Sequence, residues 1–149
     1  MRALIQRVSR CTVSTAEGNR SNIGAGLLIF FGVGKDDTKD DAHALAQRCA
    51  ALRCFQDHEG KMNLSVRDVS GEVMVVSQFT LYADTRKGNR PGYTDAADPE
   101  KAEDLYDTFV TALRTALAPL KVATGVFRAE MSVELVNQGP VTLLLESKK

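Results

Sequence analysis

The stretch that decides the fold is Leu27-Leu28-Ile29-Phe30-Phe31-Gly32-Val33, a continuous apolar run. An apolar run of this length is typical of a strand that is buried on both faces at the centre of a sheet. Gly24 and Gly26 punctuate the chain directly before it. We therefore expect a central strand here, with its partners in the segments on either side.

Alternating apolar and polar residues predict those partners. Residues 2–15 alternate as one strand, and the turn residues Glu17-Gly18-Asn19 return the chain as a hairpin strand that ends near Ile23. Further strands are expected to begin at Phe55 and to cover 72–83, 130–137 and 141–146.

Two helices are expected between these strands. Leu45, Cys49 and Leu52 recur at helical spacing after an acidic start, which predicts a helix over about 38–54. Asp98 and Pro99 have the chemistry of a helix cap and first position, and this second helix should end before Pro119. The resulting order, βββ-α-ββ-α-βββ, predicts an α+β domain with a mixed β-sheet and two main helices.

Length and composition limit the function classes. With 149 residues and 44% hydrophobic content, we expect one domain over 1–149. Lys and Arg number 19, as do Asp and Glu, so global charge cannot hold nucleic acid or an anionic membrane. No apolar run reaches the roughly 18 residues of a membrane span, and no signal-length stretch opens the chain. Three cysteines at low density fit free thiols in a reducing cytoplasm.

Histidine and metal chemistry have little support. His43 and His58 have no neighbouring Ser or Asp that suggests a triad, so we expect both on the surface. Cys49 and Cys54 lie between them, but their spacing is not that of a zinc site. Cys11 falls on the apolar face of the first strand, as a small core residue would. We expect no metal and no cofactor.

Arg7 and the segment Ser77-Gln78-Phe79-Thr80-Leu81 interrupt strands with polar groups. Arg7 shares a face with Ile5 and Cys11, so either a bulge turns it outward or it clamps backbone carbonyls inside. The second segment is either the exit of its strand at an edge or a polar site at the strand's end. The residues leave both pairs of alternatives open.

Two further segments carry the same ambiguity. Asn137-Gln138-Gly139-Pro140-Val141-Thr142 contains a proline that cannot donate to a sheet, so it is a simple turn or a segment in which a cis bond before the proline fixes the backbone in an unusual direction. Arg86-Lys87-Gly88-Asn89-Arg90-Pro91 is a compact basic loop, either solvated or in contact with phosphate.

Taken together, these motifs resemble the D-aminoacyl-tRNA deacylase family over essentially the whole chain. The resemblance begins with residues 1–8 and includes 87–91. Its most specific part is the pair of motifs at 77–81 and 137–142, in this order and at this separation.

The resemblance implies a barrel-like core and a homodimer with an active site at each subunit interface. It implies a cis bond between Gly139 and Pro140, which one subunit inserts into the site of the other. The backbone of this pair would leave no room for an L side chain, while glycine would pass. Arg7 matches the arginine that hydrogen bonds to this loop.

The implied reaction is hydrolysis of the ester in D-aminoacyl-tRNA, and in glycine mischarged on tRNA-Ala. Thr80 matches a residue proposed as nucleophile, but a lone threonine without a base is a poor one, so we expect positioning by Thr80 and backbone N–H groups, with help from the substrate's 2′-OH. The implied site has three parts: the pocket floor, the substrate contacts and candidate contacts with the tRNA acceptor end. They comprise Ser77, Gln78 and Thr80; Phe79 (for the terminal adenosine), Leu81, Asn137, Gly139, Pro140, Val141 and Thr142; and Arg86, Lys87 and Arg90.

Two other functions remain open. One is an editing enzyme for an L-substrate, which would share the expected fold. The Gly139-Pro140 pair in the motif at 137–142 of this chain argues against that function. A non-catalytic RNA-binding module that uses the basic loop would protect aminoacyl-tRNA rather than cleave it.

Overall fold

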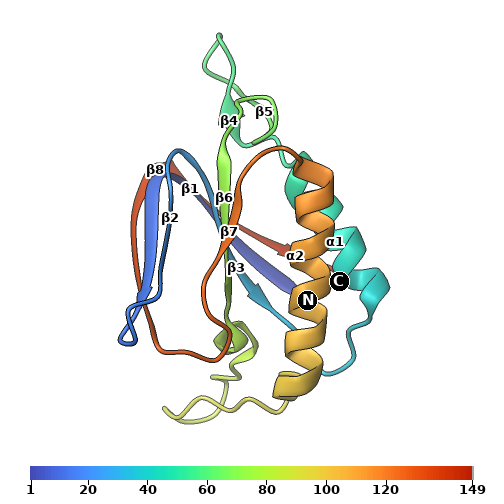
Figure 1. Ribbon diagram of the computed structural model, residues 1–149. Coiled ribbons are helices and arrows are strands. Elements are labelled where there is room, and N and C mark those ends of the chain that lie inside the picture. Colours follow the sequence, from blue (N-terminus) through green and yellow to red (C-terminus); the bar gives the residue numbers. More distant parts are fainter. Residues whose placement is uncertain (149) are drawn as a thin grey trace.

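The sheet is built around β1 (Arg2–Thr15), whose two halves pair with different strands in the computed structural model, which describes residues 1–148. The first half pairs antiparallel with β3 (Gly26–Gly32) and the second with β2 (Arg20–Ile23). On its other edge β1 pairs with β8 (Met131–Glu146) along nearly its whole length. This long, bent pair curls the sheet toward a barrel (Figure 1).

Parallel pairing extends the sheet beyond β3. β6 (Glu72–Ser77) lies parallel to β3, and β7 (Val122–Thr124) lies parallel to β6. The sheet is therefore mixed, with antiparallel pairs on one side and parallel pairs on the other. A separate hairpin of β4 (Phe55–Gln56) and β5 (Met62–Leu64) projects beyond the end of the sheet (Figure 1).

Two helices cover one face of the sheet, as Figure 1 shows. α1 (Lys39–Ala51) begins at a capping box, in which the Thr38 hydroxyl accepts from the Asp41 N–H and the Asp41 carboxylate accepts from the Thr38 N–H. α2 (Pro99–Leu117) begins with Asp98 as its cap and Pro99 in its first turn, as predicted. Their buried faces pack on the central strands and form the larger core cluster, which includes Phe31 and Phe109 with stacked rings 4.2 Å apart.

A second, smaller core fills the inside of the curl on the opposite face of the sheet. It contains Val8, Cys11, Leu28, Met74 and Val76, with Met131, Val133 and Leu135 packed against it. The predicted barrel-like core corresponds to this cluster. The described part of the chain contains no helix long and apolar enough to cross a membrane.

Three expectations about the elements were wrong. The strand expected over 72–83 ends at Ser77 and is followed by a short 3-10 helix, η1 (Phe79–Tyr82). The expected order had three strands after the second helix, but β7 was not located, because its three residues are too few to show alternation. The two strands expected at 130–137 and 141–146 are one strand, β8, interrupted by an excursion opposite Arg7.

Candidate active site

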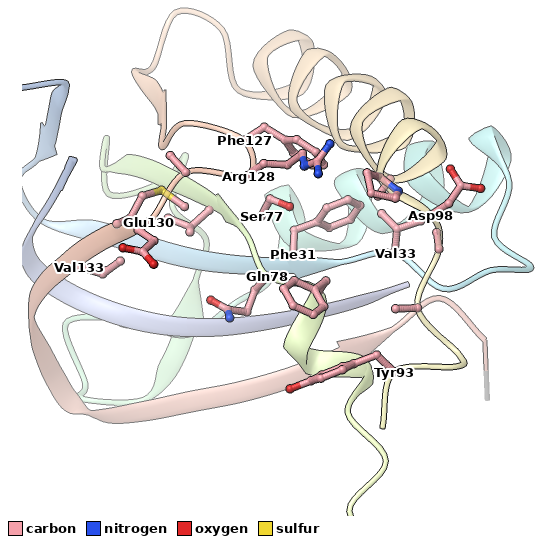
Figure 2. Close-up of a pocket in the computed structure, with 18 residues that line it drawn as sticks. Phe31, Val33, Ser77, Gln78, Tyr93, Asp98, Phe127, Arg128, Glu130 and Val133 are labelled. Carbon is pink, nitrogen blue, oxygen red and sulfur yellow. The ribbon is translucent and has the colours of Figure 1, made fainter. Parts of the chain in front are cut away.

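A cavity of about 770 Å³ opens where β6 ends and α2 begins. Its floor is made by Phe31, Val76 and Ser77 of the central strands. Its walls come from four other places along the chain: Gln78 and Phe79; Tyr93; residues 96–99 with Ala102; and residues 127–131 with Val133. Figure 2 shows Phe127 and Arg128 on one side of this cavity, Tyr93 on the other, and Ser77 and Phe31 between them.

The ladder between β3 and β6 positions the polar residues at the cavity floor. Ser77 pairs with Phe31, and the Gln78 N–H donates to the Phe31 carbonyl at 2.8 Å, so the parallel ladder continues one residue past β6. The chain then turns into η1 against Gly32. A Cβ at Gly32 would lie 3.0 Å from the Gln78 oxygen and 3.1 Å from the Leu81 Cβ, so the absence of a side chain there allows η1 to approach.

Thr80 lies outside this cavity. Its side chain is exposed, its hydroxyl accepts a hydrogen bond from the Gln78 amide, and it does not line the cavity wall. Both histidines are exposed, His43 on α1 and His58 on the β4–β5 turn, and neither lines the cavity. A nucleophilic threonine needs an adjacent base. The geometry therefore favours a positioning role for this segment over attack by Thr80.

Two exposed aromatic rings stand at the cavity mouth. Phe79 is 56% exposed and Tyr93 is 38% exposed, and their rings meet edge to face with centroids 5.0 Å apart. Rings left this open by a folded chain offer flat surfaces on which a nucleobase can stack. Sequence reasoning selected Phe79 but not Tyr93, whose signal was one aromatic residue in a loop otherwise rich in glycine, proline and aspartate.

Arg128 is a second residue that sequence reasoning missed. It lies at the i+2 position of a turn closed by the Ala129 N–H and the Val126 carbonyl, with φ of 66°. This position favours glycine, because side chains rarely adopt such a φ. Arg128 thus puts a positive charge beside the cavity, whose wall also contains Glu130.

The second predicted motif forms the excursion of β8, which we define as residues 138–141. Gln6 pairs with Thr142 and Val8 pairs with Asn137, so these four residues stand opposite the single residue Arg7 of β1. Asn137 closes the base of the excursion, since its side-chain amide donates to the Arg7 carbonyl at 3.1 Å and to the Val141 carbonyl at 3.0 Å.

Arg7 points inward, with only 8% of the residue exposed. Its Nε donates to the Gln138 carbonyl at 3.1 Å, and a terminal nitrogen donates to the Cys54 carbonyl at 2.7 Å. These are the contacts that a clamp on backbone carbonyls would make. They tie the excursion to the segment that follows α1, which also meets the donor requirement of a buried guanidinium.

Gly139 and Pro140 are exposed at the tip of the excursion, and Gly139 has φ of 125°. A Cβ at Gly139 would collide with the Arg7 guanidinium, so this position combines an unusual backbone with a close approach. The cis bond expected between Gly139 and Pro140 is not found here. Within residues 1–148 the cis peptide bond joins Ala118 and Pro119, and the Gly139–Pro140 bond has the trans form, which is favoured intrinsically by about 0.5–1 kcal/mol.

The structure does not bring the two motifs together within one chain. The excursion is level with Leu27 and Val73, whereas Ser77 is level with Phe31 at the far end of the same ladder. At ordinary strand spacings this offset, four residues along and three strands across, amounts to roughly 20 Å. Figure 1 shows the same separation, with η1 and the bend of β8 at opposite ends of the sheet.

One cation of the basic loop at residues 86–91 is already paired with a neighbouring carboxylate. Arg86 forms two hydrogen bonds to the Asp84 carboxylate at 2.9 and 2.8 Å, and these hold the pKa of Asp84 at about 2. Lys87 and Arg90 are exposed and make no ion pair among the residues that the structure covers. Lys87 and Arg90 are therefore better placed than Arg86 to meet a phosphate.

Metal and thiol chemistry find no support in the geometry. No group of three or more His, Cys, Asp or Glu side chains between Met1 and Lys148 could hold a metal ion. Cys11, Cys49 and Cys54 are buried and free. Burial raises the pKa of the Cys11 thiol to about 11 and that of Cys49 to about 12, so both are inert thiols at neutral pH.

Comparison with known proteins identifies close relatives. A family model described as D-Tyr-tRNA(Tyr) deacylase matches residues 4–146. The chain is 56% identical over 149 residues to "D-aminoacyl-tRNA deacylase" of Thermotoga petrophila and 55% identical to that of Anaeromyxobacter dehalogenans, covering 100% of this chain and 99% of each relative.

Solved structures give the same picture of the fold. One described as "c-Myc DNA Unwinding Element Binding Protein" superimposes with a TM-score of 0.91 at 38% identity over 98% of both chains. Another, described as a probable eukaryotic D-amino acid tRNA deacylase, has a TM-score of 0.81 at 16% identity over 97% of both chains, which shows a shared fold.

Proposed function

The chain belongs to the D-Tyr-tRNA(Tyr) deacylase family, and on that premise we propose that it hydrolyses the ester between a D-amino acid and tRNA. It is a hydrolase of aminoacyl-tRNA and releases the free amino acid. The observation that carries the proposal for the site is the cavity at the end of β6, with Ser77 and Gln78 in its wall and exposed aromatic rings at its mouth.

Hydrolysis of this ester requires a directed water molecule and donors for the developing oxyanion. Backbone N–H groups of Phe79 and Thr80, oriented by the turn into η1, supply these donors, because the Gln78 and Leu81 N–H groups already donate to the Phe31 and Gln78 carbonyls. Gln78 fixes the Thr80 hydroxyl, so Thr80 shapes the turn rather than attacking. The 2′-OH of the terminal ribose assists the water in place of a side-chain base.

The excursion of one subunit is the chiral filter of the other subunit's site. The backbone of Gly139 and Pro140 stands at its exposed tip and is held from behind by Arg7. Facing the substrate α-carbon, it excludes an L side chain, whereas a D side chain points away and glycine has none. Asn137, Val141 and Thr142 support this backbone from the base of the excursion.

A homodimer follows from the separation of the two motifs. Leu4 pairs with Phe30 on one side and Leu144 on the other, which makes an apolar row on the face of β1 opposite the helices. Leu144 is 52% exposed. Leu4 is midway along β1 between Arg2, which contacts η1, and Gln6, which is beside the excursion.

A two-fold axis beside Leu4 therefore brings the excursion of each subunit toward η1 of its partner. Such an isologous interface completes both sites at once. It also covers the apolar row, as a stable interface would.

The tRNA acceptor end enters at the aromatic mouth. Phe79, together with Tyr93, stacks on the terminal adenosine, and Leu81 lies behind this contact in η1. Lys87 and Arg90 meet phosphates of the acceptor strand, with Arg86 held by Asp84 to shape the loop. The whole chain acts as one domain in the cytoplasm, needs no cofactor, and also clears glycine mischarged on tRNA-Ala.

The test is a deacylation time course on three substrates: D-Tyr-tRNA, L-Tyr-tRNA and glycine on tRNA-Ala. We expect rapid loss of D-Tyr and of glycine, with L-Tyr retained. Loss of both tyrosines would instead indicate an L-editing enzyme. Binding of all three without turnover would indicate an RNA-binding module.

A further inference from the structure

We infer that Arg128 binds a phosphate group of the tRNA acceptor end, in the wall of the cavity across from Tyr93 (Figure 2). The inference rests on the proposed function and deepens it, because it names a side chain that holds the nucleotide at the reacting end of the tRNA. Neither the proposed reaction nor the basic loop at residues 86–91 involves this residue.

The charges around the cavity give Arg128 a special place. Among the described residues that line this cavity, Arg128 is the one cation, and the other charged side chains are Asp98 and Glu130. The Asp98 carboxylate caps α2, where it accepts from the Lys101 N–H at 2.9 Å. Both carboxylates repel a polyanion, so the wall attracts a phosphate group only through Arg128.

The guanidinium of Arg128 is available to a ligand. The residue is exposed, and it forms no ion pair with any other residue between Met1 and Lys148. It also borders a second hollow of about 380 Å³, whose acidic residues come from α2: Glu100, Glu103, Asp104 and Asp107. These carboxylates repel a polynucleotide from the flank of α2, so an RNA strand reaches Arg128 from the side of the larger cavity.

The backbone at Arg128 has a conformation that glycine adopts more readily. Its φ is 66°, in the turn that the Ala129 N–H closes on the Val126 carbonyl at 3.2 Å. A larger residue stays in this left-handed region only where the surrounding structure holds it, and such residues concentrate at binding sites. An arginine here therefore costs stability, and a role in binding gives a reason for that cost.

Contacts on both sides fix the turn that carries Arg128. Just before the turn, the Gly125 N–H donates to the Val75 carbonyl of β6 at 3.1 Å. Within the turn, Phe127 packs on the larger core, and its ring centroid is 5.8 Å from that of Tyr106. Arg128 is thus presented on a rigid support, which reduces the conformational entropy lost when it binds an anion.

The aromatic rings at the mouth indicate which phosphate Arg128 binds. In the proposed function the terminal adenosine stacks on Phe79 and Tyr93. The cavity volume of about 770 Å³ is typical of a site that encloses a small ligand. With the base on the side of Tyr93, the 5′-phosphate of the same nucleotide faces the opposite wall. The planar guanidinium of Arg128 can donate there to two phosphate oxygens at once.

The first test compares the binding of adenosine 5′-monophosphate (AMP) and of adenosine, which lacks the phosphate, by NMR titration. We expect the native protein to bind AMP about tenfold more tightly than adenosine. Arg128→Gly and Arg128→Gln should lose this preference, and Arg128→Lys should keep part of it. Arg67→Gln removes the same charge from an exposed arginine before the start of β6, at the end remote from the cavity, and should keep the native preference.

The unfolding temperature separates the loss of a ligand contact from damage to the fold. Arg128→Gly relieves the left-handed backbone, so its unfolding temperature should rise by roughly 2–4 °C, whereas Arg128→Gln should unfold at the native temperature. Ser70→Gly is the matched control, because Ser70 has φ of 52° and does not line the cavity. It should also unfold at a higher temperature and should bind AMP as the native protein does. A lower unfolding temperature of Arg128→Gly would assign the side chain to the fold and overturn the inference.

The second test uses the complete substrate. With D-Tyr-tRNA, Arg128→Gly should raise KM by about tenfold and leave kcat within about twofold. The slope of log KM against log salt concentration should fall by roughly 0.7, the value for one single-strand phosphate contact. A native KM and a native salt slope in Arg128→Gly would overturn the inference.

The AMP titration stands apart from the proposed reaction. If the native protein fails to deacylate D-Tyr-tRNA, the proposed function is refuted, and a preference for AMP that disappears in Arg128→Gly still supports a phosphate site at Arg128. If the native protein shows no preference for AMP over adenosine, or if Arg128→Gly keeps the preference, the inference is overturned.

Discussion

At the scale of single residues, Arg7 departs most clearly from the pattern of its strand. The alternation of the first strand put a guanidinium on the core face, and this alone raised the two readings of a bulge and a clamp. The structure shows the clamp, because the side chain stays inside and the bulge, which is on β8, does not turn Arg7 outward. Sequence could identify the residue as exceptional, but its partners Gln138 and Cys54 are more than forty positions away and needed the fold.

Replacement of Arg7 by alanine should lower activity more than stability. The change leaves the Gln138 and Cys54 carbonyls without their donor, which costs about 1–3 kcal/mol of unfolding free energy. It also frees the excursion, so we expect kcat/KM for D-Tyr-tRNA to fall at least about a hundredfold. Normal deacylation by a folded Arg7→Ala protein would contradict the clamp role, and Gln6→Ala, next to it on β1, is the matched control.

For Thr80 we expect a much smaller loss of activity than for Arg7. Its hydroxyl is exposed and accepts from Gln78, so Thr80→Ala should remove one turn contact and reduce kcat by about tenfold or less. Single-turnover deacylation of D-Tyr-tRNA measures this step directly. Complete loss of turnover with tRNA binding retained would mean that Thr80 is the nucleophile after all.

Among the elements, those with strong local signals were predicted well. The helix start near residue 38, the cap at Asp98, the long alternating first strand and the apolar run at 27–33 all appear close to where the pattern put them. The 3-10 helix was missed, because Phe79-Thr80-Leu81-Tyr82 has strand-like residues and its turn is imposed by Gly32 and Arg2 from elsewhere. β8 was predicted as two strands, because proline has no N–H to donate to a sheet. In the structure this proline lies in the excursion, so β8 pairs with β1 on both sides of it.

The cap of α1 offers a control for stability without function. Thr38→Ala removes the hydroxyl that accepts from Asp41, so the free energy of unfolding should fall by about 1 kcal/mol. Because α1 does not line the cavity, kcat for D-Tyr-tRNA should stay at the native value. Urea denaturation and the deacylation assay, run on the same sample, check both statements, and a drop in kcat would show that α1 is coupled to the site.

For the molecule as a whole, the buried thiols set an upper pH limit for the stability of the fold. The Cys11 and Cys49 thiols have pKa values of about 11 and about 12 in the folded chain, raised by burial from 9.0. The folded chain therefore holds these protons longer than the unfolded one, so stability is retained below pH 9.0 and falls as pH rises from there toward 11 and 12.

Alkylation tests this protection. Iodoacetamide at pH 8 should leave all three cysteines unmodified in the native protein and modify them in urea. Mass spectrometry counts the adducts. Rapid modification of the native chain would show that one thiol is accessible and that the core opens more readily than its burial indicates.

At the scale of the whole molecule, the sequence of one chain could not show how the two motifs meet. The motifs at 77–81 and 137–142 pointed to one site, yet they lie at opposite ends of the sheet within a chain. Residue pattern and spacing predict contacts along the sequence and between paired strands, but they do not predict contacts with a second copy of the chain. The proposed dimer rests on the resemblance, and the apolar row at Leu4, Phe30 and Leu144 is a surface that such a dimer would cover.

Subunit mixing tests most directly whether each site is shared between two chains. Gly139→Val spoils the excursion, because its side chain meets Arg7, and Ser77→Phe fills the cavity. Each homodimer should fail to deacylate D-Tyr-tRNA. A heterodimer of the two, isolated with two different tags, has both defects in one shared site and keeps the other intact, so it should show about half of native activity. A heterodimer as inactive as its parents would mean that each chain builds its own site, and would contradict the account.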